Sequence, residues 1–209
     1  MIVRLITRFL GGPWRLRERC LSAPQGPGRR LLVALYKARL QLDGAWISLE
    51  ADIASAPCFP HGMAGVFISG GVTIGHNSVI FQQVTIGSNT LADATRLGAP
   101  LIGDCCYIGA GAKIIGGIAI GHHVRIGANA VVHRDTPDNC VVTNGPQQTR
   151  ELGAPPDNRF IHRYHGRWVC HADGRRMPIE DASLLRRLDA GFTMDRTAGG
   201  SRPPQSDAR

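Results

Sequence analysis

The chain has 209 residues, 43% of them hydrophobic and 6% aromatic, which is enough for one sizeable domain with appended segments. Its apolar runs fall short of the roughly 20 residues of a membrane-spanning helix, and the N-terminus has no recognisable secretory signal, so we expect a cytoplasmic protein. The formal net charge of +8 suits an anionic partner, but the basic residues are unevenly spread, and too few lie in the central region for a nucleic-acid groove.

Residues 1–46 form a basic segment that we expect to be helical. Glu18 is the one acidic residue among residues 1–42, which contain many arginines. The stretch LLVALYKARLQL (31–42) has the spacing of an amphipathic helix. Its apolar face either packs on the main domain or contacts the inner face of the membrane with its arginines toward acidic lipid, and the sequence leaves both readings open.

Residues 47–145 contain a repeat with a period of six, which fits neither a helix nor a simple strand. A glycine often follows the repeated aliphatic residue, and sixteen positions separate two of the repeats, which predicts a loop inserted between them within residues 87–101. Six residues suffice for one short strand and a corner, so the pattern predicts an all-β solenoid whose stacked coils share one core. The repeated positions are Ile68, Ile74, Ile80, Ile86, Ile102, Ile108, Ile114, Ile120, Ile126 and Val132.

After the solenoid, residues 146–192 should form a small unit of their own. RFIHRYHGRWVCHADGRRMPI (159–179) alternates β-forming residues around two turn signals and predicts a β-meander, and EDASLLRRLDAG (180–191) predicts a short helix. The meander is a candidate to cap the open edge of the solenoid. Residues 193–209 are rich in Gly, Ser, Pro and Arg, and we expect a disordered tail.

The six cysteines include the adjacent pair Cys105 and Cys106, but none form a Cys-x-x-Cys motif. This usage favours free thiols in a reducing compartment over a disulfide framework or a zinc site. Adjacent His122 and His123 project in different directions and have no carboxylate at ligand spacing, so we expect no metal.

Three segments carry a family resemblance: FPHGMAGVFISGGVTIG (59–75), FQQVTIGSNT (81–90) and APLIGDCCYIGAGAKIIGGIAIGHHVRIGANAVVHRDTPDN (99–139). The chain resembles the hexapeptide-repeat acyltransferases, and most closely the serine acetyltransferases and their surface-polysaccharide O-acetyltransferase relatives. The resemblance implies a left-handed parallel β-helix, a homotrimer with acetyl-CoA between neighbouring copies, and acetyl transfer to a hydroxyl with a histidine as general base.

The resemblance places the catalytic histidine at His61 in PHGMAG. A hydroxyl is a weak nucleophile. An imidazole, which has a pKa of about 6.5, can remove the proton of the hydroxyl while its oxygen attacks a thioester. The family orients this histidine with an upstream aspartate, for which Asp52 is the candidate; the alternative for Asp52 is a solvated corner residue. His76, His122 and His123 follow repeat glycines and should be exposed corner residues.

For acetyl-CoA, the positions that match the family are Ala110 and Ala128, which stand eighteen residues apart and should stack on one edge. Small side chains there would let the pantetheine arm lie against the backbone. Ser88 falls near the family's thioester site. Arg125 replaces a family lysine and, like Lys113, is a candidate partner for a CoA phosphate.

The acceptor is harder to predict. Serine acetyltransferases hold serine with an Arg-His pair, where this chain has Gly98-Ala99-Pro100, and with an aspartate, where it has Pro60. A sugar hydroxyl needs no such charged groups, so we favour a saccharide acceptor. The alternatives are serine, giving O-acetylserine for cysteine biosynthesis, and a non-catalytic scaffold.

Overall fold

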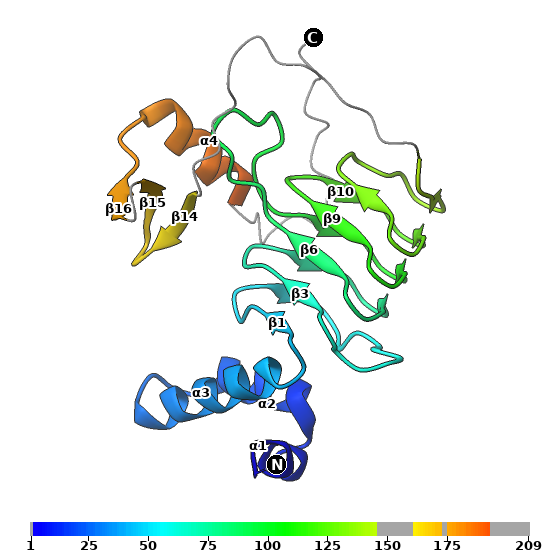
Figure 1. Ribbon diagram of the computed structural model, residues 1–209, viewed down its shortest axis with the longest axis vertical. Helices are drawn as coiled ribbons and strands as arrows, with labels where there is room; N and C mark the ends of the chain where they lie inside the picture. The colour runs from blue at the N-terminus through cyan, green and yellow to red at the C-terminus, as the bar shows by residue number, and fades with distance from the viewer. Residues whose placement is uncertain (1, 146–160, 173–174, 193–209) are drawn as a thin grey trace.

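The computed structural model describes residues 2–145, 161–172 and 175–192. Figure 1 shows the N-terminal helices at one end, a stack of short strands in the centre and a small subdomain against one side of the stack. The helices are α1 (Ile2–Phe9), α2 (Gly12–Ser22), α3 (Pro27–Gln41) and α4 (Ala182–Phe192). The expected tail 193–209 and the segment 146–160 lie outside the described residues, and the division at residues 46, 145 and 192 stays a prediction.

Three parallel sheets form the sides of the central rod. Sheet A contains β1 (Trp46–Ile47), β3 (Phe67–Ile68), β6 (Thr85–Gly87), β9 (Lys113–Ile115) and β12 (Val131–Val132). Sheet B contains β2 (Asp52–Ile53), β4 (Thr73–Ile74), β7 (Leu101–Ile102) and β10 (Ala119–Ile120). Sheet C contains β5 (Val79–Ile80), β8 (Tyr107–Ile108), β11 (Arg125–Ile126) and β13 (Val141–Val142). The chain passes from A to B to C in each coil, which gives AB, BC and CA corners.

The repeated aliphatic residues fill the interior of the rod. Along sheet A, Ile47, Ile68, Ile86, Ile114 and Val132 pair in parallel register, and all are buried. No single coil encloses this core, because each side chain is covered by those of the coils above and below. The predicted β-helix fold class is confirmed.

Close stacking at the corners explains the glycines that follow the repeated positions. A Cβ atom added to Gly109 would lie 2.7 Å from the backbone nitrogen of Ala128, in the next coil. Such a distance is far inside van der Waals contact, so only glycine fits. Asn129 at the next CA corner has a φ of 58°, the left-handed region that asparagine tolerates better than most residues.

The N-terminal helices pack on the first coil of the rod. Leu16, Tyr36 and Leu40 are buried in one core with the repeat residues, and the Tyr36 hydroxyl donates a 3.0 Å hydrogen bond to the carbonyl of Ile47. Burial raises the pKa of Tyr36. The apolar side of α3 therefore faces the main domain, as one of the two sequence readings proposed.

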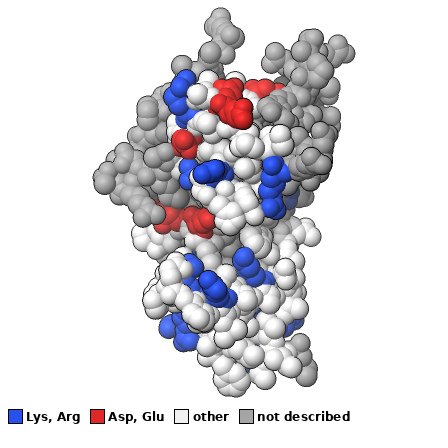
Figure 2. Space-filling model, turned by 90° about the vertical axis from the view of Figure 1, so that its left-hand side faces the viewer, with Lys and Arg blue, Asp and Glu red and all other residues white. Residues whose placement is uncertain are grey.

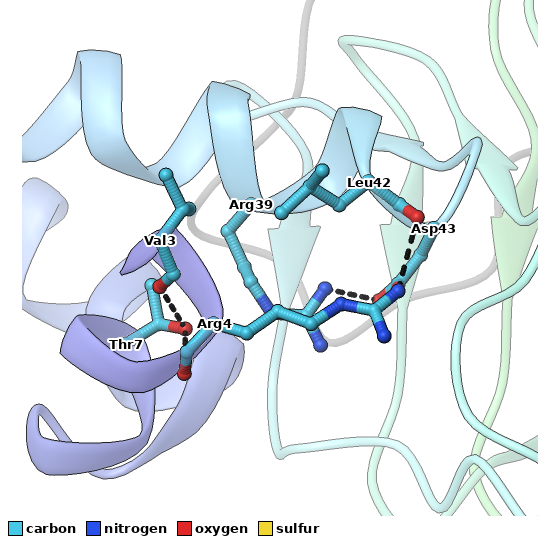
Figure 3. A network of polar contacts seen from close by, with 6 residues as sticks. All are labelled: Val3, Arg4, Thr7, Arg39, Leu42 and Asp43. Atoms are coloured by element: carbon cyan, nitrogen blue, oxygen red, sulfur yellow. Dashed lines mark hydrogen bonds and ion pairs between the residues drawn. The ribbon is translucent and has the colours of Figure 1, made fainter. Parts of the chain in front are cut away.

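Helix α1 is fastened to α3 by a polar network (Figure 3). Arg4 and Arg39 both pair with the carboxylate of Asp43, and Arg4 also donates to the carbonyl of Leu42. The Thr7 hydroxyl is buried and bonds back to the carbonyl of Val3 at 2.9 Å. Among the described helices, none is both long and apolar enough to cross a lipid bilayer.

The C-terminal subdomain is an antiparallel sheet of β14 (Ile161–Tyr164), β15 (Arg167–Ala172) and β16 (Arg175–Pro178), followed by α4. It packs on the loop that leaves the rod after β6 and returns before β7, shown in green beside α4 in Figure 1. Arg187 donates to the carbonyls of Ala92 and Ala94 in this loop, and Leu97 lies in the apolar core of the subdomain. The described meander thus lies beside the AB corner of the rod, next to the inserted loop.

Candidate active site

His61 lies on the CA corner at the end of the first coil. The chain takes nine positions to pass from Cys58, which bridges to β5 on sheet C, to Phe67 on sheet A, whereas six suffice from Val79 to Thr85. The additional residues make the corner protrude and leave the His61 side chain exposed. Its ring packs edge-on against Phe81 of the second coil, with centroids 5.4 Å apart and an angle of 85°.

One nitrogen of the His61 ring has a defined partner. Nδ1 lies 3.0 Å from Oε1 of Gln82. An amide oxygen can only accept a hydrogen bond, so this contact requires a proton on Nδ1 and leaves Nε2 of the neutral ring as the proton acceptor. This is the tautomer that a general base needs, with its basic nitrogen on the side away from the orienting partner.

The two alanines predicted to bind acetyl-CoA lie on the same corner as His61. Gln83 N–H donates to the Ala64 carbonyl at 2.8 Å, Gly111 N–H donates to Gln82 at 3.0 Å, and Asn129 N–H donates to Ala110 at 2.8 Å. Ala110 and Ala128 are therefore stacked in successive coils directly along the rod from Gln82. The CA corner forms one column that begins with His61 and continues over small side chains.

Lys113 and Arg125 occupy the faces on either side of this column. The Lys113 ammonium on sheet A donates to the Gln83 carbonyl at 2.7 Å, so it helps to fix the corner beside Gln82. The Arg125 side chain on sheet C is exposed, with its guanidinium 5.9 Å from the centre of the Tyr107 ring. Both cations flank the CA corner at the level of the fourth coil.

Asp52 does not orient His61 in the described structure. It belongs to β2 on sheet B, where it pairs with Thr73, one and a half sides of the rod away from the CA corner. The Asp52 carboxylate instead acts electrostatically on Arg17: burial lowers the pKa of Arg17, and the charge of Asp52 offsets part of that decrease. In the described structure the Nδ1 nitrogen of His61 contacts the amide of Gln82 rather than the Asp52 carboxylate, a contact that the sequence analysis did not predict.

Ser88 lies on the AB corner, where its N–H donates to the Ser69 hydroxyl at 3.0 Å. One side of the rod separates this corner from the CA corner, and its five to six extended residues span roughly 15–20 Å. Within one copy of the chain, Ser88 and His61 therefore lie too far apart to contact the same reacting group.

His76 and His122 lie on the BC corner and take part in hydrogen bonds between its coils. His76 N–H donates to the Asp104 carboxylate at 2.6 Å, Asp104 N–H donates to Nδ1 of His122 at 3.0 Å, and His122 N–H donates to the Asp138 carboxylate at 2.7 Å. Each side chain caps a backbone group of the preceding coil. In the part of the chain that the structure describes, no three His, Cys, Asp or Glu side chains are grouped to hold a metal ion.

Comparison with known proteins gives consistent matches. The family model for the bacterial transferase hexapeptide (six repeats) matches residues 99–134. A serine acetyltransferase of Mycobacterium tuberculosis is 33% identical over 187 residues, which cover 86% of this chain and 75% of that protein. One from Synechococcus elongatus is 34% identical over 171 residues, covering 80% of this chain and 63% of that protein.

Solved structures agree with these relatives. The soybean serine acetyltransferase apoenzyme has a TM-score of 0.55 and 30% identity, over 64% of this chain and 54% of that one. Serine acetyltransferase isoform 3 from Entamoeba histolytica, solved with cysteine, has a TM-score of 0.53 and 25% identity, over 68% and 50% of the two chains. The chain therefore spans about half the length of these solved proteins and less than two thirds of the Synechococcus relative.

These matches overturn the preference for a saccharide acceptor. That preference depended on the missing Arg-His pair, yet the matched sequences and structures carry the name serine acetyltransferase. Loss of one set of charged side chains does not identify an acceptor, because other parts of the fold can supply replacements. The chain belongs to the serine acetyltransferase family of hexapeptide-repeat transferases.

Proposed function

We propose that the protein transfers the acetyl group of acetyl-CoA to the hydroxyl of L-serine and produces O-acetyl-L-serine. The observation that carries this proposal is the CA column, in which His61 stands in line with Ala110 and Ala128. A proton acceptor and a smooth edge for the pantetheine arm thus occur on one side of the rod. The names of the relatives support serine as the acceptor.

In the proposed reaction, Nε2 of His61 takes the proton of the serine hydroxyl as the oxygen attacks the thioester carbonyl. The carbonyl oxygen becomes an oxyanion, which backbone N–H groups at the corners can stabilise. Collapse of this intermediate breaks the C–S bond, and the imidazolium returns its proton to the departing CoA thiolate. Gln82 holds the ring in the required tautomer throughout.

For acetyl-CoA, we propose that Ala110 and Ala128 contact the pantetheine arm and that Arg125 meets a CoA phosphate. Arg125 is exposed and free of any carboxylate partner among the described residues, so its charge is available to a phosphate. The Lys113 ammonium already donates a hydrogen bond to the Gln83 carbonyl on this corner, so it is a weaker candidate for binding a phosphate than Arg125.

We propose a homotrimer as the active assembly. Two observations support it. Large apolar side chains are exposed on the faces of the rod, with Phe67 41% and Val131 62% exposed on sheet A and Val141 64% exposed on sheet C. His61 and Ser88 lie on opposite edges of sheet A, which selects sheet A as the inward face. A ring of copies that turns sheet A inward would cover Phe67 and Val131 and bring the two edges together. The proposed substrates are cytoplasmic metabolites, which supports a cytoplasmic location.

A peripheral membrane contact through residues 1–42 is a separate proposal. Ile2, Leu5 and Phe9 on α1 are 71%, 56% and 83% exposed, and the lower end of the face in Figure 2, which the N-terminal helices form, shows basic and no acidic side chains. This combination suits anionic lipid. Co-sedimentation with vesicles containing phosphatidylglycerol, reduced in Phe9→Glu, would support it; equal sedimentation of both proteins would refute it.

The test of the proposed function is CoA release by the purified protein from acetyl-CoA, with L-serine and with a panel of sugars. We expect release to depend on serine and to fall by about 100–10,000-fold in His61→Ala, the range for loss of a general base. His76→Ala, an exposed histidine on the BC corner, is the matched control and should keep its activity. Failure to bind acetyl-CoA at all would favour the scaffold reading.

A further inference from the structure

A cavity of about 540 Å³ lies between the AB corner of the rod and the C-terminal subdomain. The rod contributes Glu50 and its AB corner Ser88, and the inserted loop contributes Thr90. The meander contributes Arg163 and Trp168, and Phe192 closes one side from α4. These residues come from segments far apart in the sequence. The cavity exists because the subdomain packs on the loop that leaves the rod at this corner.

Two charged groups of opposite sign lie in the wall of this cavity. The Glu50 carboxylate lies over Gly70, where an added Cβ would be 2.8 Å from Oε2 of Glu50, so glycine keeps this place open for it. Arg163 lies across the Trp168 ring at 5.0 Å and donates to Asp189 at 2.9 Å. Trp168 donates to the same Asp189 oxygen at 2.8 Å, so the guanidinium is held against the cavity wall.

This set of groups matches the chemistry of an α-amino acid. A guanidinium binds a carboxylate, and a carboxylate binds an ammonium group. The hydroxyls of Ser88 and Thr90 add neutral donors and acceptors. The loop between β6 and β7 carries no Arg-His pair before Pro100, and the subdomain that packs on this loop brings an arginine to its edge.

The cavity lies at the same height along the rod as His61. Glu50 belongs to the first coil and Ser88 to the third, while His61 ends the first coil and bonds Gln82 in the second. The two sites occupy opposite edges of sheet A. Rotation about an axis parallel to the rod preserves height, so a closed ring with sheet A inward brings the AB edge of one copy to the CA edge of the next.

We propose that the acceptor amino acid binds in this cavity, with Arg163 on its carboxylate and Glu50 on its ammonium group, and that His61 of the neighbouring copy takes its hydroxyl proton. The proposal rests on the proposed serine acetyltransferase function. It names the acceptor as a free α-amino acid, and it explains how the chain binds one without the charged pair in its loop.

The first experiment pairs an enzyme change with a substrate change. In Arg163→Gln, we expect the KM for L-serine to rise about ten-fold or more, the effect of losing one charge-assisted hydrogen bond, with the KM for acetyl-CoA unchanged. Arg167→Gln, an exposed arginine of the same sheet outside the cavity, is the matched control. The wild type should prefer L-serine over L-serinamide, and Arg163→Gln should lose that preference.

The substrate comparison separates binding from folding, because a merely misfolded subdomain would lower both rates and keep their ratio. Glu50→Gln should likewise lose the preference for L-serine over 3-hydroxypropionate, which lacks the ammonium group. Unchanged preferences in both variants would overturn the proposal while leaving serine acetylation intact. Absence of serine-dependent turnover in the wild type would instead refute the proposed function, and this inference with it.

The second experiment asks whether two copies share the site. His61→Ala and Arg163→Gln are co-expressed and assayed at a serine concentration far below KM, where His61→Ala alone is nearly inactive and Arg163→Gln alone keeps about a tenth of wild-type activity or less. Random mixing in a ring leaves about one quarter of the shared sites with both residues intact, so we expect about a quarter of wild-type activity. Activity no higher than the mean of the two separate variants would show that the site is not shared.

Discussion

Replacement of Gln82 by leucine tests how the proposed base is oriented. The structure gives the Nδ1 nitrogen of His61 one partner among the described residues, the 3.0 Å contact with the neutral Gln82 amide. A neutral hydrogen bond contributes about 0.5–1.5 kcal/mol, so if the contact acts wholly in the transition state its loss lowers kcat about two- to ten-fold. This is far less than the loss expected for His61 itself, because the base remains and only its orientation weakens.

The assay is steady-state CoA release, with kcat and both KM values measured for Gln82→Leu, Gln82→Glu and Asp52→Asn. Gln82→Glu keeps an acceptor for Nδ1 and should retain or exceed wild-type kcat, since a carboxylate stabilises the imidazolium better than an amide. Asp52→Asn should leave kcat unchanged, because Asp52 lies on sheet B. A large loss in Asp52→Asn with none in Gln82→Leu would refute this account of the site.

Three further predictions concern stability and reactivity. Ile114→Ala, at a fully buried position between two coils, should lower the free energy of unfolding by about 2–5 kcal/mol. The urea midpoint, measured by circular dichroism at fixed protein concentration, should fall accordingly, and a shift within error would contradict the stacked core. Hydrogen bonds from Trp168 and Arg163 hold the pKa of Asp189 below its usual value, so its contribution to stability is present near neutrality and is lost as pH falls through that lowered value; an acid titration of unfolding should therefore be shallower for Asp189→Asn. The exposed thiols of Cys58 and Cys105 should react first with Ellman's reagent, ahead of the buried cysteines, and simultaneous reaction of all thiols would contradict the fold.

The repeat made the rod predictable from sequence. A period of six held from Ile68 to Val132 apart from one inserted loop, and each repeated residue has one environment, the core. The eighteen-residue spacing of Ala110 and Ala128 likewise follows from three sides per coil, and the structure stacks them on one corner. The location of each residue that belongs to the repeat could thus be predicted from the sequence alone.

The partner of His61 could not be read in this way. Asp52 lies nine residues before His61, which is one and a half sides of the rod and places Asp52 on another face. The sequence alone did not reveal this, because the corner after Cys58 contains additional residues and the repeat therefore does not fix the position of His61. Gln82 is close because it lies one coil further on, at the same corner. Its only sequence signal is a separation of twenty-one, which is one coil of eighteen plus the three additional corner residues.

The acceptor cavity was also beyond the sequence. Arg163 lies more than a hundred positions from Glu50, and no periodicity links the meander to the rod. Contact between the meander and the rod depends on Leu97 and its neighbours in the inserted loop, which pack on the subdomain. This is a tertiary contact that no local sequence pattern predicts. The absence of the Arg-His pair from the loop therefore pointed to the wrong acceptor, and the replacement that we propose lies in a different part of the chain.

The most direct test of the central claim is identification of the product by mass spectrometry. Purified wild-type protein is incubated with acetyl-CoA carrying a ¹³C-labelled acetyl group and L-serine, beside His61→Ala under the same conditions. The account predicts labelled O-acetyl-L-serine from the wild type and at most about one hundredth as much from the variant. Equal labelling by both proteins, or CoA release without labelled O-acetyl-L-serine, would contradict it.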